Sequence, residues 1–407
     1  MSAISLSEQI VVDAAAAAPM LAQVEAWAAL NTGSRNLDGL RDMAAVLANA
    51  FSALPGDIAL IDPAPVDTVA PDGQVLPLSH GQHLHMTVRS QAPVQILLTG
   101  HMDTVFAATD GFQALKWLEP GVLNGPGVAD MKGGLAIMLA ALKALEHSPI
   151  SQSIGYEVVI NSDEEVGSAS SSALIARAAR GKIAALTYEP ALPDGTLAGA
   201  RAGSGNFSIV VLGRSAHAGR NPEDGRNAVV AAADIALRLK AASGVRPNGQ
   251  GFSCNPAKID GGGPNNVVPD HAVLRVNFRP RTPADEIAAS ILLDQVIADV
   301  AALHDVLIHR HGGFGRPPKP MDEKTEGLFG LVKRCGEDLG IAIGWRDTGG
   351  VCDGNNIAAC GVPVVDTMGA RGGSIHSPDE FLMTDSLPER ARLSALTMMR
   401  IAKHALR

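Results

Sequence analysis

An alternation of short apolar strands with helices in the first half of the chain constrains the fold most. The expected elements, in chain order, are strand 94–99, helix 131–145, strand 156–160, helix 171–179 and strand 183–188. A helix between two strands has the length to return the chain across the sheet, which favours parallel pairing. The pattern therefore predicts an α/β fold with a mainly parallel sheet flanked by helices on both faces.

Further elements lie on either side of this core. They are an amphipathic helix at residues 15–30, a helix at 37–51 capped by Asn36, strands at 57–61 and 84–89, a helix at 325–339, an apolar stretch at 362–366 and a final helix at 386–406. Asn36 suits the start of a helix because its side-chain oxygen accepts a free backbone N–H there. We expect these elements to complete the same domain.

The segment after residue 200 has a different character and predicts a second domain. Its expected elements are strand 206–212, helix 228–241, strand 272–278 and helix 283–302. With 407 residues, two domains are also the ordinary expectation. We predict an inserted α+β domain at residues 201–314 and a catalytic domain at residues 1–200 and 315–407, with the proline-rich stretch 316–320 marking the return.

Composition excludes several classes of protein. The net charge of −9 argues against nucleic acid as a partner, because binding phosphates needs a basic face. The four cysteines show no CxxC spacing, which favours reduced thiols in a cytoplasm. No basic stretch precedes the apolar N-terminus, and no run of about 18 uninterrupted apolar residues stands out. We therefore expect a cytoplasmic protein that does not bind a membrane.

Seven polar residues fall where strands of the predicted sheet end. They are His101 and Asp103 after strand 94–99, Asp130 before helix 131–145, Glu164 and Glu165 after strand 156–160, Glu189 after strand 183–188, and His376 after the stretch 362–366. Ligands of open α/β sheets bind beyond the carboxyl ends of the strands. These side chains are therefore candidates for one common site.

Each residue alone has an ordinary explanation, such as a helix cap for Asp130 or a solvated turn for Glu164 and Glu165. Together they place several acids at one edge, where like charges repel unless cations hold them. Imidazole and carboxylate ligands without thiolate suit zinc, cobalt or manganese in a hydrolytic site. The combination therefore predicts a metal centre, with zinc as the first choice.

Three stretches of sequence carry a resemblance to a known family. Residues 99–105 read Thr-Gly-His-Met-Asp-Thr-Val, residues 125–134 read Gly-Pro-Gly-Val-Ala-Asp-Met-Lys-Gly-Gly, and residues 163–168 read Asp-Glu-Glu-Val-Gly-Ser. The chain resembles the M20 metallopeptidases, a group that includes carboxypeptidase G-type glutamate carboxypeptidases, acetylornithine deacetylase and succinyl-diaminopimelate desuccinylase. The resemblance implies a homodimer whose inserted domain serves for dimerisation and as a lid.

The resemblance also implies roles for the seven polar residues. One zinc ion would bind His101, Asp130 and Glu189, and a second would bind Asp130, Glu165 and His376, so that Asp130 bridges them. Cobalt or manganese could replace zinc. Glu164 would be the general base for the attacking water, and the carboxylate of Asp103 would accept the second ring N–H of His101.

Four further residues match positions that meet the substrate in this family. His217, in the stretch 213–219, would reach into the partner subunit's site and stabilise the oxyanion. Asn266 would contact the substrate, Arg279 would bind its carboxylate through a forked pair of hydrogen bonds, and Gly350 lies in a glycine-rich loop beside it. A lysine that the carboxypeptidase G branch has after its Glu ligand is missing from residues 190–200, which leaves glutamate specificity open.

These expectations favour a metal-dependent hydrolase that cleaves an amide bond next to a free carboxylate, in a small molecule or short peptide. A carboxypeptidase that releases a C-terminal glutamate or a similar amino acid is the first hypothesis. A deacylase of N-acyl amino acids, related to the deacetylase and desuccinylase branches, is the alternative. Outside enzymes, an inactive metal-binding or peptide-binding relative remains open.

Overall fold

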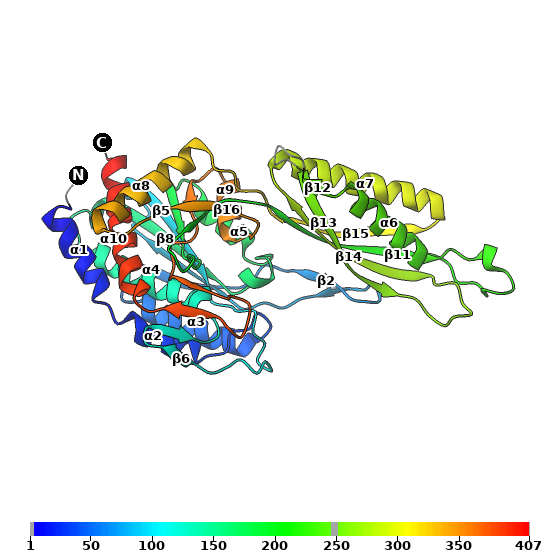
Figure 1. Ribbon diagram of the computed structural model, residues 1–407, viewed down its shortest axis with the longest axis horizontal. Coiled ribbons are helices and arrows are strands. Elements are labelled where there is room, and N and C mark those ends of the chain that lie inside the picture. Colours follow the sequence, from blue (N-terminus) through cyan, green and yellow to red (C-terminus); the bar gives the residue numbers. More distant parts are fainter. Residues whose placement is uncertain (1–3, 246–250, 407) are drawn as a thin grey trace.

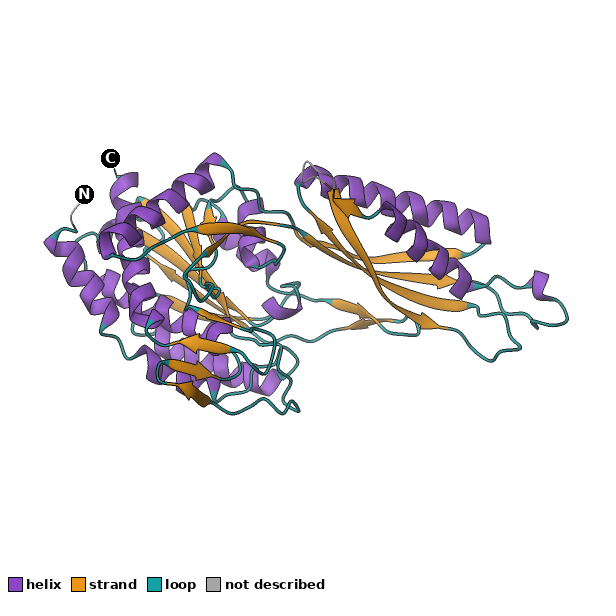
Figure 2. Cartoon of the chain, viewed as in Figure 1, coloured by secondary structure: helices purple, strands orange, loops and turns teal. Residues whose placement is uncertain are grey.

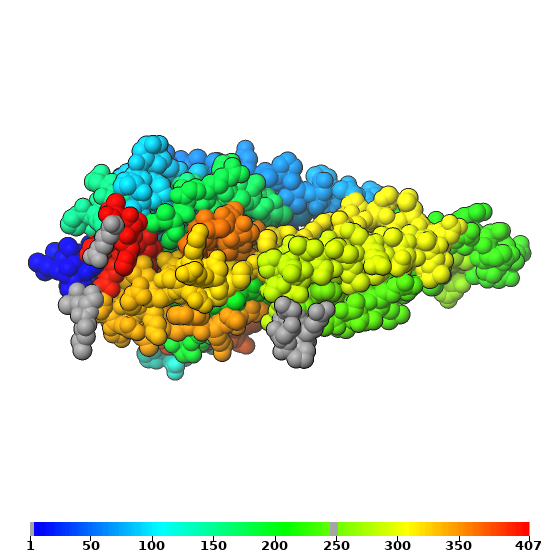
Figure 3. Space-filling model, turned by 90° about the horizontal axis from the view of Figure 1, so that it is seen from above, coloured from blue at the N-terminus to red at the C-terminus, as the bar shows by residue number. Residues whose placement is uncertain are grey.

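The computed structural model describes residues 4–245 and 251–406. It shows two lobes placed side by side along the long axis, and in the space-filling view they form one elongated body (Figures 1, 2 and 3). The larger lobe contains both described ends of the chain, and residues 204–316 form the smaller lobe. The lobes follow from two separate hydrophobic cores, one under each sheet.

A six-stranded mixed sheet forms the centre of the larger lobe. In spatial order its strands are β1 (Asp57–Ile61), β4 (His83–Val88), β8 (Ile154–Asn161), β5 (Val94–His101), β9 (Ala184–Thr187) and β17 (Val364–Val365). The four strands from β8 to β17 pair in parallel, whereas β4 pairs antiparallel with β8 and with β1. The predicted α/β class is confirmed, with an antiparallel edge added.

Helices cover both faces of this sheet because its central strands are apolar on both sides. Ile96 and Leu98 of β5 join one core, and Leu97 between them joins the opposite core. The first core is covered by α1 (Leu6–Ala16), α2 (Met20–Ala28), α3 (Leu37–Phe51), α4 (Gly134–Glu146), α8 (Glu323–Leu339) and α10 (Ser386–Ala405), and the second by α5 (Ser172–Ala179) and α9 (Asp353–Ala359). Continuous apolar runs of this kind are typical of strands buried on both faces.

The N-terminal helix prediction needs a correction. Instead of one helix at residues 15–30 there are two, α1 and α2, and Pro19 lies between them because its ring cannot continue a helix. The cap of α3 is confirmed, since the Asn36 side chain accepts the Gly39 N–H at 3.2 Å. By length and composition alone, Leu6–Ala28 and α7 (Pro283–His304) are long and apolar enough to cross a membrane. The first of these stretches comprises the two separate helices α1 and α2.

Several short strands escaped prediction. They form a sheet of β18 (Gly372–Gly373), β19 (Phe381–Met383), β7 (Val122–Asn124) and β6 (Lys116–Glu119), a hairpin of β2 (Asp67–Val69) and β3 (Val75–Pro77), and a parallel pair of β10 (Leu197–Arg201) and β16 (Trp345–Thr348). Short helical turns occur at η1 (Val128–Gly133), η2 (Ser151–Ser153), η3 (Glu164–Val166) and η4 (Pro222–Asp224). Strands of two to five residues contain too little alternation to be recognised.

The smaller lobe is an antiparallel five-stranded sheet with two helices on one face. Its strands, in spatial order, are β12 (Gly244–Val245), β13 (Gly251–Gly261), β14 (His271–Pro280), β11 (Ser204–Leu212) and β15 (Leu307–Arg316), covered by α6 (Ala228–Ala242) and α7. Only β11 and β14 were predicted. Pro256 in β13 and the glycines of β15 are residues that strands usually avoid, and they hid both strands.

Two chain crossings form a neck between the lobes. Arg201 and Lys319 exchange backbone hydrogen bonds at 2.9 and 3.0 Å. The buried Asn355 amide donates to the carbonyl oxygens of Ala202 and Pro317 at 2.9 and 2.7 Å, so it bridges the two crossings. The predicted domain boundaries, at 200/201 and 314/315, fall close to this neck, and we keep that division as a proposal.

The β2–β3 hairpin makes a second connection between the lobes (Figure 1). It extends from the larger lobe and packs Val69 against Val210 and Val273 of the smaller sheet. Arg275 of β14 donates to the Val69 carbonyl oxygen at 2.6 Å. The lobes are therefore held together both at the neck and at this hairpin.

Candidate active site

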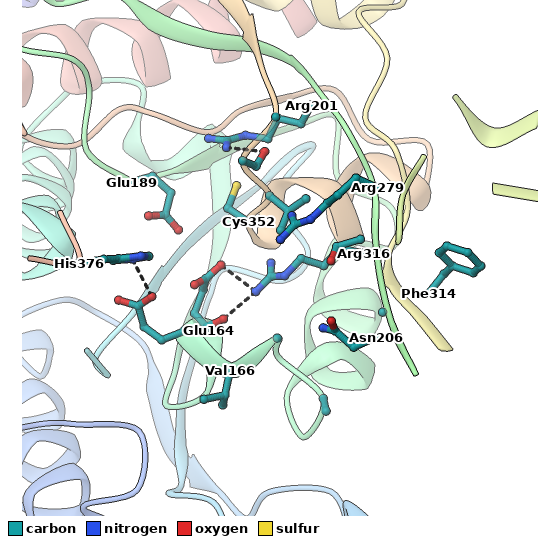
Figure 4. Close-up of a pocket in the computed structure, with 18 of the residues that line it drawn as sticks. Glu164, Val166, Glu189, Arg201, Asn206, Arg279, Phe314, Arg316, Cys352 and His376 are labelled. Atoms are coloured by element: carbon teal, nitrogen blue, oxygen red, sulfur yellow. Dashed lines mark hydrogen bonds and ion pairs between the residues drawn. The ribbon is translucent and has the colours of Figure 1, made fainter. Parts of the chain in front are cut away.

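A cavity of about 1330 Å³ lies between the lobes, and both contribute to its walls. Glu164 and Glu189 come from the ends of the central strands β8 and β9, and Asp130 and His376 come from segments that follow β7 and β18, so the four residues predicted at one edge lie in one cavity. The smaller sheet supplies Arg279 and other polar side chains from the face that its helices leave open (Figure 4). The site therefore combines the carboxyl edge of one sheet with the uncovered face of another.

His101 and Asp130 form the first half of the candidate metal centre. His101 is the last residue of β5, and Asp130 lies in η1 ahead of α4 rather than directly before a helix at residue 131. The His101 Nε2 atom lies 3.1 Å from Asp130 Oδ1 and 3.6 Å from Glu189 Oε2. These three side chains converge on one point, as ligands of one ion would.

The second half uses the other oxygen of Asp130. His376 Nε2 lies 3.3 Å from Asp130 Oδ2 and 3.0 Å from Glu165 Oε2. Each carboxylate oxygen of Asp130 thus faces a different histidine, with one further carboxylate beside each. The structure thus places the five predicted ligand residues in one cluster around His101 and Asp130.

The electrostatics of this cluster call for a cation. Burial, followed by repulsion from Asp130, raises the pKa of Glu165 to about 8. Burial also raises the pKa of Glu189, whose Oε1 atom is buried without a hydrogen-bond partner among residues 4–245 and 251–406. Hydrogen bonds that His376 donates to the carboxylates of Asp130 and Glu165 raise the pKa of its imidazole to about 11. Buried acids of this density fit a dinuclear metal site, where the ions compensate their charge.

Asp103 holds the turn that carries Glu164 and Glu165. Its carboxylate accepts the backbone N–H groups of Glu164 at 3.1 Å and Glu165 at 3.2 Å, and the Ser34 hydroxyl at 2.7 Å. His101 Nδ1 lies 3.0 Å from the Asp103 backbone oxygen and 3.4 Å from its carboxylate. The backbone oxygen and the carboxylate of Asp103 thus both lie near the ring, and the bond from the ring N–H to the carboxylate stays a prediction.

Glu164 lies beside this cluster and is paired with Arg316, a residue that the sequence analysis missed (Figure 4). Arg316 donates to Glu164 Oε1 at 2.7 Å and to Asp353 at 3.1 Å, and it is almost fully buried. Burial raises the pKa of Glu164 to about 7, against the opposing effect of Arg316. In the sequence, Arg316 lies in the stretch Gly-Arg-Pro-Pro at residues 315–318, which indicates the return of the chain to the larger lobe but not a role for the arginine.

Arg279 and Gly350 both line the cavity, as predicted. Arg279 donates to Asn277 at 2.9 Å and has no acidic partner in the described part of the chain. Burial and then the nearby Arg316 lower the pKa of Arg279. The Gly350 carbonyl oxygen accepts from Arg201, which is itself paired with Asp366 at 2.7 Å. In the described part of the chain, Arg279 is thus a cationic group of the cavity without an acidic partner, and the same holds for Arg35 and Arg346, which also line it.

His217 and Asn266 lie elsewhere. Both are exposed in loops at the outer end of the smaller lobe, the far right of Figure 1, and neither lines the cavity. The two loops pair with each other, since the Ala218 N–H donates to the backbone oxygen of Asn266 at 2.9 Å and His217 forms an isolated β-bridge with Val267. Within one chain, His217 and Asn266 therefore lie close to each other and away from the candidate metal centre.

Comparisons with known proteins agree with this geometry. The family model described as peptidase family M20/M25/M40 matches residues 97–400. Carboxypeptidase G2 of Pseudomonas sp. (strain RS-16) is 29% identical over 329 residues, covering 78% of this chain and 77% of that protein. Succinyl-diaminopimelate desuccinylase of Stenotrophomonas maltophilia (strain R551-3) is 30% identical over 338 residues, covering 77% and 85%.

A solved structure shows the same fold across almost the whole chain. It is an M20 family metallo-carboxypeptidase from Sulfolobus solfataricus, with a TM-score of 0.71 and 16% identity. The match covers 95% of this chain and all of the other. The mixed sheet, the flanking helices and the second lobe are thus common to both proteins.

Proposed function

Because the chain belongs to peptidase family M20/M25/M40, whose members are hydrolases, we propose that it is a two-zinc enzyme that cleaves an amide bond next to a free carboxylate. One observation carries the proposal. The two oxygens of Asp130 face two separate histidines, each with a further carboxylate, and Glu164 lies next to them. A shared aspartate between two such groups is the donor set of a dinuclear hydrolytic site.

Zinc fits the donors that this chain offers. His101, Asp130 and Glu189 would hold one ion, and Asp130, Glu165 and His376 the other, with nitrogen and oxygen ligands that zinc accepts. Cobalt and manganese accept the same donors. Bound metal would supply an activated water and polarise the scissile carbonyl.

The chain's own groups would carry the proton and position the reactants. Arg316 holds Oε1 of Glu164, which leaves Oε2 to take a proton from the attacking water and return it to the leaving nitrogen. Asp103 fixes the backbone of the same turn, so the base and the ligand Glu165 keep a constant spacing.

Recognition of the substrate carboxylate is assigned to Arg279, since its charge has no acidic partner in the described chain and it lines the cavity. The carboxypeptidase relative favours release of a C-terminal glutamate or a similar amino acid. The desuccinylase relative supports the alternative, a deacylase of N-acyl amino acids, because both reactions use the same metal centre. Arg201 cannot stand in freely for the missing lysine, since Asp366 already pairs with it.

We further propose a cytoplasmic homodimer. The outer helices of the smaller lobe expose large apolar side chains, among them Leu237 of α6 (71% exposed) and Ile287 and Ile291 of α7 (63% and 62%). Such a patch is typical of a protein interface. A partner chain would also give His217 and Asn266 a cavity to act on, which their own chain does not.

The test is a substrate panel with metal-depleted protein reloaded with zinc, cobalt or manganese. Peptides ending in glutamate or other amino acids are compared with N-acetyl and N-succinyl amino acids. Hydrolysis of peptides selects the carboxypeptidase, and hydrolysis of the acyl compounds selects the deacylase. If the protein binds two metal equivalents and cleaves none of these substrates, it is the inactive relative and the enzymatic proposal is wrong.

A further inference from the structure

Glu380 is a buried carboxylate that no step of the proposed reaction uses. Its side chain is only 1% exposed, and it accepts three backbone N–H groups from the loop before α4. Oε2 accepts from Gly127, and Oε1 accepts from Ala129 and from Asp130, each at 3.0 Å. Both oxygens of the Glu380 side chain accept hydrogen bonds here. Hydrogen bonds to an ionised carboxylate are stronger than hydrogen bonds to a neutral acceptor.

The loop that Glu380 holds carries the bridging ligand. Residues 127–131 do not form a regular helix, because Gly127 has a left-handed backbone (φ 72°) and Asp130 and Met131 have non-helical angles. Their N–H groups therefore lack the partners that a helix would supply. Glu380 satisfies three of them and so determines where the Asp130 side chain starts.

The same residue belongs to the segment that carries His376. Only three residues separate His376 from Glu380, and β19 follows directly with Phe381 paired to Asn124 of β7. The Asn124 side chain donates to the backbone oxygens of Glu380 and Pro378 at 2.7 and 3.0 Å. Glu380 thus joins the two segments that present Asp130 and His376, the pair separated by 3.3 Å.

A buried lysine lies in the same region. Lys132 is 1% exposed, donates to the Leu30 backbone oxygen at 3.2 Å, and is attracted electrostatically to Glu380 and Asp103. Burial lowers the pKa of Lys132 to about 8, whereas the attraction to these two carboxylates favours its charged form. Glu380 and Lys132 are thus two buried charged groups beside the candidate metal centre, and such groups are costly to bury unless they have a function there.

We propose that Glu380 is a positioning residue that fixes Asp130 relative to His376, so that the affinity for the second metal ion depends on it. The inference rests on the proposed two-metal function. A residue that orients metal ligands contributes about 10-fold to 100-fold in metal affinity. The effect should appear in metal binding itself, independently of turnover.

The decisive variant is Glu380→Gln, which has nearly the same shape but places an NH2 group where one acceptor oxygen was. Asp379→Asn is the matched control, because it removes the same charge from the neighbouring, exposed residue. Leu47→Val is the structural control, since it loosens the packing of the buried face of α3 against β1 and β4, away from Glu380. Zinc affinity and stoichiometry are measured by competition with a chromogenic chelator, together with the melting temperature of the metal-free proteins.

We expect Glu380→Gln to weaken binding of the second zinc equivalent at least about tenfold, and both controls to stay within about twofold of the unmodified protein. If Glu380→Gln lowers the melting temperature as Leu47→Val does but binds both equivalents with unchanged affinity, Glu380 is only structural and the inference fails. If the unmodified protein binds no second equivalent, the proposed two-metal function fails instead. The two failures are therefore distinguishable.

Discussion

The two lobes prepare their functional residues in different ways. In the larger lobe, His101, Asp130 and Glu189 are buried and already within hydrogen-bonding or ion-pair distance of one another. In the smaller lobe, His217 and Asn266 are exposed on outer loops that do not reach the cavity of their own chain. On the proposed function, the metal-binding groups are therefore complete within one chain, whereas His217 and Asn266 need a second chain to reach a cavity.

The difference has a physical reason. Carboxylates that are crowded together need support from the backbone and from counter-charges before any ligand arrives, and a sheet edge supplies that support. Groups that contact a substrate can remain solvated until the substrate and a second chain are present. Variants in each lobe test this difference.

The largest effect is expected at the base. Glu164→Gln should lower kcat by about a thousandfold, because no other group in the turn takes the proton. Zinc content should be unchanged, since Glu164 is not one of the proposed ligands. Steady-state kinetics and metal analysis measure the two quantities, with the exposed Glu119→Gln as control. Near-normal turnover would refute the assignment of the chemistry to the larger lobe.

Two arginines of the cavity should differ in their effect on stability. Arg316→Met leaves Glu164 and Asp353 buried without a counter-charge and should lower the free energy of unfolding by about 3 kcal/mol. Arg279→Met removes a charge that has no acidic partner in the described chain, so its cost should stay below about 1 kcal/mol while KM rises. Urea unfolding compares the two. Equal losses in the free energy of unfolding would mean that the ion pairs of Arg316 with Glu164 and Asp353 do not stabilise the fold more than the unpaired Arg279 does.

The contribution of the smaller lobe is tested by mixing chains. His217→Ala should lower kcat about a hundredfold if His217 stabilises the oxyanion. Co-expression with Glu164→Gln should restore about a quarter of the unmodified activity, because half of the dimers are hybrids and each hybrid has one complete site. Absence of any recovery in verified hybrids would place the action of His217 within its own chain.

The smallest effect is expected far from the cavity, at Glu8 of α1. Burial alone would raise its pKa, but bonds from Ser5 and Lys403 outweigh burial and lower the pKa to about 2. The stabilisation is present above pH 4.5, the ordinary pKa, and is lost as the pH falls toward 2. Glu8→Gln should therefore cost about 1 kcal/mol at pH 7 after solvent screening. Its unfolding curve should approach that of the unmodified protein at pH 2 to 3, and a constant difference at all pH values would contradict this origin.

The sequence was informative where chemistry and periodicity coincide. The position of the five ligand residues and Glu164 near one sheet edge was predicted from the apolar strands, whereas their roles as ligands and base were predicted from the resemblance to the M20 metallopeptidases. The structure brings the side chains together. Arg316 was missed because its partners, Glu164 and Asp353, are remote in sequence, and no local pattern marks such a pair. Glu380 was missed for the same reason, since its partners are backbone N–H groups about 250 residues away.

The β2–β3 hairpin has a consequence for substrate size. Two lobes joined only at the neck could rotate relative to each other. The hairpin contacts the smaller lobe at a second point, through the packing of Val69 and the hydrogen bond from Arg275 to its carbonyl oxygen, and so limits this motion. The segments that carry this hairpin out from the larger lobe, residues 62–66 and 78–82, then set the width of the gap between the lobes, and residues of both line the cavity. Lengthening or trimming these segments should widen or narrow the opening while leaving the proposed metal ligands unchanged, so selection can change which molecules enter without altering the chemistry.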